Sequence, residues 1–146
     1  MRHLLIAVAA ALMFAVPASA HHSFAMYDQT TTKTLSGKLT RYVPGANHAQ
    51  LLFIVVDNDG NPVMKNGKPM QFGVETGSAI VMARANVTVK TMAEGTYITV
   101  RFYPLRDGRD FGALAGMLVT CSTTMPSGGC TPETGQRLIG DSFSAQ

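Results

Sequence analysis

The sequence predicts a mainly β protein, specifically a small OB-like Greek-key β-barrel of five or six strands with one short helix between strands 3 and 4. Three observations support this fold class. Apolar residues alternate with polar ones over several short segments, turn-forming residues separate those segments, and one short stretch has helical spacing. A β-sandwich is the alternative, because the pattern of a single sequence does not give the order of strands within a sheet.

The first three expected strands precede the helix. Residues 34–43 (TLSGKLTRYV) place apolar side chains on one face at even spacing, as in a half-buried strand. Residues 48–57 (HAQLLFIVVD) are apolar and rich in β-branched side chains, which predicts a central strand buried on both faces. A turn at 58–62 and another at 65–68 then lead to a third strand over 70–75, where apolar residues alternate with polar or small ones.

The pattern changes period after the third strand. Residues 76–78 (TGS) can cap a short helix over 79–85, which ends where Asn86 can adopt a left-handed conformation. Alternation then returns, and it predicts further strands at 97–103, 111–120 and, as a short sixth, 136–139. This order, three strands, a helix and two more strands, is that of an OB-like barrel.

The first twenty residues have the three parts of a secretory signal peptide. A basic start is followed by an apolar run from Leu4 to Val16, and Pro17-Ala18-Ser19-Ala20 ends in a small-x-small pattern. The run is too short to span a membrane, which needs about 20 apolar residues. We therefore expect residues 1–20 to be a signal peptide, 21–33 an N-terminal arm, and 34–146 a single OB-like domain. Cleavage after Ala20 predicts a periplasmic protein with no membrane span after signal removal.

The charge composition argues against two classes of protein. The formal net charge is +3, and charged residues make up 14% of the chain. A disordered acidic chain and an electrostatic nucleic-acid binder are both disfavoured by these values, so no nucleic acid is expected as a partner.

The two cysteines frame a polar, turn-rich loop. Cys121 and Cys130 enclose the sequence STTMPSGG, which fits neither a helix nor a strand. In an exported chain with two cysteines this spacing predicts a disulfide that closes the loop at 121–130. A thiolate metal site is the alternative, and it needs more soft ligands than one pair of cysteines offers.

Several short motifs together resemble a bacterial exported family, catalogued as domain of unknown function 6152. These motifs are HHSFAMYD at 21–28, LSGKL at 35–39, Asn47-His48, Val74-Glu75 and PLRDG at 104–108. The resemblance covers about residues 21–120 and implies an exported, compact β domain. It implies no established activity, so the function has to be argued from the chemistry of the residues.

The predicted mature N-terminus carries the most specific chemistry in the chain. After cleavage, His21 offers its α-amine and its imidazole to the same ion. Two nitrogen donors on one residue suit Cu(II), which favours tetragonal nitrogen sites. His22 or His48 can supply a further imidazole, and Glu75 can accept a hydrogen bond from an imidazole N–H. The sequence therefore predicts a copper site with His21, His22 and His48 as candidate ligands.

We expect a small exported ligand-binding protein rather than an enzyme, with copper as the metal bound. An envelope module that contacts another periplasmic protein or a glycan is the alternative, and in that case the histidines are incidental. A copper oxidoreductase is less favoured, because it also needs an open coordination position and a surface for substrate.

Overall fold

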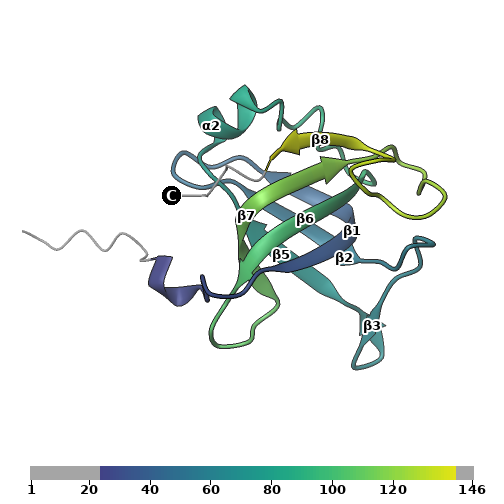
Figure 1. Cartoon of the computed structure of the whole chain (residues 1–146), viewed down its shortest axis with the longest axis horizontal. Coiled ribbons are helices and arrows are strands. Elements are labelled where there is room, and N and C mark those ends of the chain that lie inside the picture. The colour runs from purple at the N-terminus through teal and green to yellow at the C-terminus, as the bar shows by residue number, and fades with distance from the viewer. Residues whose placement is uncertain (1–23, 141–146) are drawn as a thin grey trace, which may run out of the picture.

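The computed structural model describes residues 24–140, and within that range it is a β-barrel with one short α-helix (Figure 1). A single turn of 3-10 helix, η1, spans Phe24–Met26 before the first strand. The elements that follow are β1 (Lys33–Val43), β2 (Gln50–Val55), β3 (Met64–Lys65), β4 (Lys68–Pro69), β5 (Gln71–Glu75), α2 (Ala79–Arg84), β6 (Tyr97–Pro104), β7 (Phe111–Thr120) and β8 (Gln136–Ile139).

The strand order confirms the OB-like barrel. Among the described residues, the main sheet has the order β5-β2-β1-β6-β7-β8, and β5 also pairs with β7. The β5–β7 pairing is parallel and closes the barrel, whereas all the other pairs of neighbouring strands in the barrel are antiparallel. The sheet therefore curls onto itself instead of splitting into the two layers of a sandwich, and β8 extends it beyond the closed part.

The prediction that residues 48–57 are buried on both faces is wrong. In β2, fully buried side chains such as Leu51 and Phe53 alternate with half-buried ones such as Leu52 and Ile54. A barrel encloses only its inner face, so the outer side chains of β2 are covered in part by their neighbours on the outer surface. The sequence is continuously apolar here because the outward-facing side chains of β2 are apolar as well as the inward-facing ones.

The turns follow the predicted chemistry. The β3–β4 hairpin turns through Asn66 and Gly67, whose φ angles of 52° and 74° are the left-handed values of a type I′ turn. On β7, Gly116 has a φ of 93° and lies where the register with β6 shifts, so a β-bulge bends the strand there. This bend helps the long strand β7 to curve around the barrel.

The helix α2 closes one end of the barrel. Ser78 caps it, since its side chain accepts a hydrogen bond from the Val81 backbone N–H, and Asn86 follows with a φ of 60° as expected. The helix ends at Arg84, one residue short of the prediction. Met82 is fully buried and belongs to the same apolar cluster as the barrel interior. No helix in residues 24–140 is long and apolar enough to cross a membrane.

The predicted disulfide is present outside the barrel wall. Cys121 and Cys130 are joined, with their Cα atoms 5.9 Å apart. Cys130 packs with Val56, Tyr97 and Val119 in a small cluster separate from the main core. The disulfide therefore fastens the loop between β7 and β8 against the outside of the barrel.

Candidate functional site

His48 is held rigidly between the first two strands at the helix end of the barrel. On its C-terminal side, the Ala49 N–H donates to the Gly77 carbonyl, and the Thr76 N–H donates to the Ala49 carbonyl. Thr76 is fully buried, and its hydroxyl also donates to these carbonyls. The backbone next to His48 is thus fixed to the segment that joins β5 to α2.

The two ring nitrogens of His48 have different surroundings. Nδ1 lies 3.2 Å from the Thr76 carbonyl oxygen and 3.5 Å from Oε1 of Glu75. A carbonyl oxygen only accepts hydrogen bonds, so Nδ1 carries a proton, and Nε2 is the ring nitrogen that can offer a lone pair to a ligand. Nε2 has no partner among residues 24–140, and the side chain is 41% exposed. One ring nitrogen of His48 is thus oriented by a hydrogen bond, and the other is open to a ligand.

Glu75 connects His48 to the N-terminal arm. Tyr27 is almost fully buried, and burial together with the charge of Glu75 and a hydrogen bond to that carboxylate raises the pKa of Tyr27 to about 12. The Tyr27 hydroxyl is therefore a stable donor to Glu75 at neutral pH. One carboxylate thus faces both His48 and the arm.

The arm is fastened along the end of β6. Tyr27 forms a β-bridge with Leu105, and the Asp28 N–H donates to the Pro104 carbonyl at 2.8 Å. The Phe24 ring packs edge-on against Tyr103, with centroids 6.0 Å apart. The sequence predicted an irregular arm over 21–33, whereas residues from Phe24 onward are ordered by these contacts and β1 begins at Lys33.

The structure brings together some of the predicted site residues. His48 and Glu75 are in contact, as expected for a ligand and its hydrogen-bonding partner. His21 and His22 lie outside the described residues, as does the predicted signal peptide. Within residues 24–140 there is no group of three or more His, Cys, Asp or Glu side chains placed to hold a metal ion.

Tyr27 is the site residue that the sequence analysis missed. Its position in the HHSFAMYD motif placed it in an arm that was expected to be irregular. Its contact with Glu75 joins segments almost 50 residues apart in the chain, and no local periodicity reports such a contact. The family motifs could have indicated this contact, because one of them contains Tyr27 and another is Val74-Glu75.

Fold and site define the protein as a small OB-like β-barrel with an N-terminal arm fixed beside an oriented histidine. The family described as "Family of unknown function (DUF6152)" matches residues 9–114, and the chain belongs to this family. No curated protein and no solved structure matches the chain.

Proposed function

We propose that the mature protein binds Cu(II) through the α-amine and imidazole of His21 and through Nε2 of His48. The amine and the His21 ring form a chelate, and His48 adds a third nitrogen from the barrel. In this proposal Glu75 orients the His48 ring and is not itself a ligand. His22 stays outside the site or replaces His48 in a weaker, purely local chelate.

The observation that carries the proposal is the shared carboxylate. The Glu75 carboxylate accepts a hydrogen bond from Tyr27 of the arm, and its Oε1 lies 3.5 Å from His48 Nδ1. One side chain, that of Glu75, therefore connects Tyr27 of the arm to His48. The six residues from Tyr27 back to His21 span at most about 20 Å when extended. This length allows His21 to reach the open nitrogen of His48.

The proposal also includes the compartment. A free α-amine on His21 requires that the first twenty residues be removed, which is what the signal-peptide pattern predicts. We therefore place the protein in the periplasm as a copper-binding protein rather than an enzyme.

The test is a Cu(II) titration of protein whose first residue is verified as His21 by mass spectrometry. We expect sub-micromolar binding and electron paramagnetic resonance signals of three coordinated nitrogens. The His48→Asn variant should bind more than about 100-fold more weakly, since loss of a ligand exceeds the usual effect of a second-sphere partner. Glu75→Gln should weaken binding by about tenfold, because the His48 ring is less well oriented.

Two controls separate this site from an accidental N-terminal chelate. His22→Asn removes a neighbouring imidazole and should change the affinity by less than about threefold. Acetylation of the α-amine should abolish tight binding. Equal affinity for wild-type protein and His48→Asn would show that copper binds only to the terminal peptide, and the proposal would then be wrong.

A further inference from the structure

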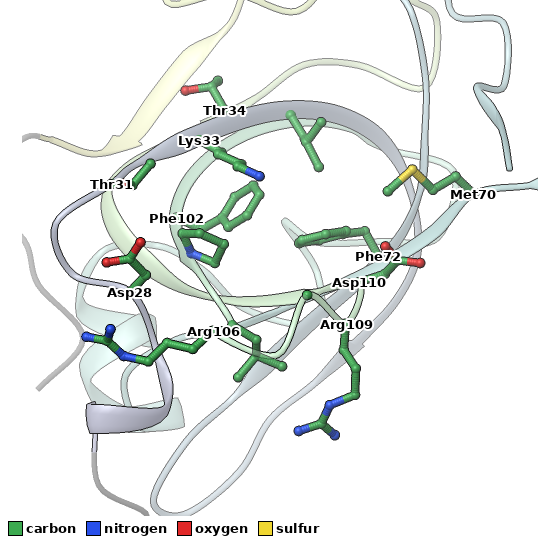
Figure 2. A pocket seen from close by; sticks show the side chains of 14 residues that line it. Asp28, Thr31, Lys33, Thr34, Met70, Phe72, Phe102, Arg106, Arg109 and Asp110 are labelled. Carbon is green, nitrogen blue, oxygen red and sulfur yellow. The ribbon is translucent and has the colours of Figure 1, made fainter.

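The opposite end of the barrel is open and hollow. It encloses about 820 Å³ between the start of β1, the start of β5 and the loop after β6. Figure 2 shows the rings of Phe72 and Phe102 inside the opening. These rings pack on each other with centroids 4.7 Å apart. The apolar lining consists of Leu35, Met70, Phe72, Phe102, Pro104 and Leu105.

Most charged side chains around this opening already have partners. The Asp28 carboxylate accepts from the Thr30 N–H and hydroxyl, at 3.1 and 2.6 Å, and these bonds lower its pKa. Arg106 Nε donates to the Ala25 carbonyl at 3.0 Å. In Figure 2 the guanidinium groups of Arg106 and Arg109 point away from the opening.

Four further charged side chains at this end of the barrel form two ion pairs. Arg109 Nε lies 2.8 Å from Asp107, and Lys65 Nζ lies 2.6 Å from both carboxylate oxygens of Asp110. Each pair joins one cation to one carboxylate, so the two pairs contribute little net charge to the hollow.

Lys33 is the exception on the rim. Its ammonium has no hydrogen bond or ion pair among residues 24–140, and Figure 2 shows it reaching over the opening beside Phe102. Three cations and two carboxylates line the hollow: Lys33, Arg106 and Arg109 against Asp28 and Asp110. The ion-pair partners Lys65 and Asp107 add one charge of each sign, so one net positive charge remains. An apolar hollow with one unpaired cation is complementary to an apolar molecule with one negative charge.

We propose that the open end of the barrel binds a small amphiphile with a single carboxylate or an equivalent anionic group. The apolar body packs on Leu35, Met70 and Phe72, and the anionic head pairs with Lys33. The volume is within the range of about 300–1,000 Å³ typical of small-molecule sites, and barrel mouths are a common place for them. This site lies at the other end of the barrel from His48 and does not depend on the proposed copper site.

Indoleacetate is a suitable probe, because the chain contains no Trp and indole fluorescence therefore reports only the ligand. Fluorescence anisotropy of indoleacetate, titrated with the full mature protein, should give a dissociation constant of about 0.1 mM for a ligand of this size. Indoleacetamide has the same ring and no charge, and it should bind about fivefold more weakly. Equal binding of both compounds would overturn the role of the anionic group.

Two matched variants test the role of Lys33. Lys33→Gln should weaken indoleacetate binding by about fivefold and leave indoleacetamide binding unchanged. Lys90→Gln makes the same change in net charge at an exposed position between α2 and β6, outside the hollow, and should leave the binding of both ligands unaffected. Equal effects of the two variants would show that only the overall charge matters, which contradicts the proposal.

Methyl NMR of the methionines locates the ligand without a core substitution. The aromatic ring of bound indoleacetate should shift the Met70 methyl signal, because Met70 lines the hollow. Met117 and Met125, which pack against the separate cluster near the disulfide, should not move. Absence of saturable binding, or shifts at these two residues with Met70 unmoved, would overturn the proposal.

Discussion

The two ends of the barrel are built differently. At the closed end, α2 inserts the fully buried Met82 into the core, and the neighbouring loop holds His48 by backbone hydrogen bonds. At the open end, no helix in the described chain covers the hollow, where Leu35 and Met70 are partly exposed and charged side chains form the rim. The same five strands thus support a rigid polar site at one end and an apolar hollow at the other.

This difference shows how a small barrel separates stability from binding. A buried plug contributes apolar burial and fixes nearby side chains, so a residue such as His48 can keep one orientation. An open end gives up some burial and leaves apolar surface available to a ligand. We therefore expect mutations at the two ends to have different effects on stability.

The largest expected difference is between two methionines. Met82→Ala should lower the free energy of unfolding by about 3 kcal/mol, because it leaves a cavity in a fully packed site. Met70→Ala, at the partly exposed rim of the hollow, should cost about 1 kcal/mol. Urea unfolding followed by circular dichroism measures both values. Equal losses would contradict the distinction between a plugged and an open end.

A smaller effect concerns the tie between the arm and the closed end. The pKa of Tyr27 is raised from 10.0 to about 12, so the folded state favours the protonated phenol. Its contribution to stability is fully present below pH 10 and is lost as the pH rises through 12. Between about pH 9 and pH 11, wild-type protein should lose about 1 kcal/mol more stability than Tyr27→Phe.

Urea unfolding of both proteins over this pH range measures the difference. Tyr42, whose pKa is also raised by burial, is present in both proteins and cancels in the comparison. Parallel pH profiles for the two proteins would show that the Tyr27–Glu75 contact does not hold the arm.

The smallest effect lies at the rim of the open end. Lys65→Gln removes the pair with Asp110, and because this pair is exposed the stability should fall by only about 0.5 kcal/mol. The freed carboxylate should also weaken indoleacetate binding by about twofold, while copper binding is unchanged. Urea unfolding measures the change in stability, and titration calorimetry with indoleacetate and with Cu(II) measures the two binding effects. An equal loss of copper affinity would mean that the two ends are coupled.

Much of the fold could be predicted from local sequence patterns. The alternation over 97–103 predicted β6, Asn66-Gly67 predicted a turn, and Ser78 predicted the start of α2. The error concerned the outer face of β2, because apolar side chains there look the same in sequence whether a second layer covers them or not. The closure of β5 on β7 involves non-local pairing, which no local pattern contains.

The candidate sites were only partly predictable. His48 and Glu75 could be proposed because their residue types suit metal binding, and the structure places them in contact. Tyr27 and Lys33 could not, because their significance depends on neighbours that are distant in sequence. Lys33 in particular is an ordinary residue at the start of a strand, and only its position over the hollow and its lack of a partner within residues 24–140 distinguish it.

The seam between β5 and β7 has a consequence for the dynamics of the barrel. Three residue pairs join these strands, fewer than in any other pairing that closes the barrel in the described chain: Gly73–Phe111, Val74–Gly112 and Glu75–Ala113. Local opening should therefore begin here, and the amide protons of the seam should exchange with solvent before those of β1. Glu75 ends the seam on one side and Phe72 precedes it on the other, so a ligand at either end should slow this exchange.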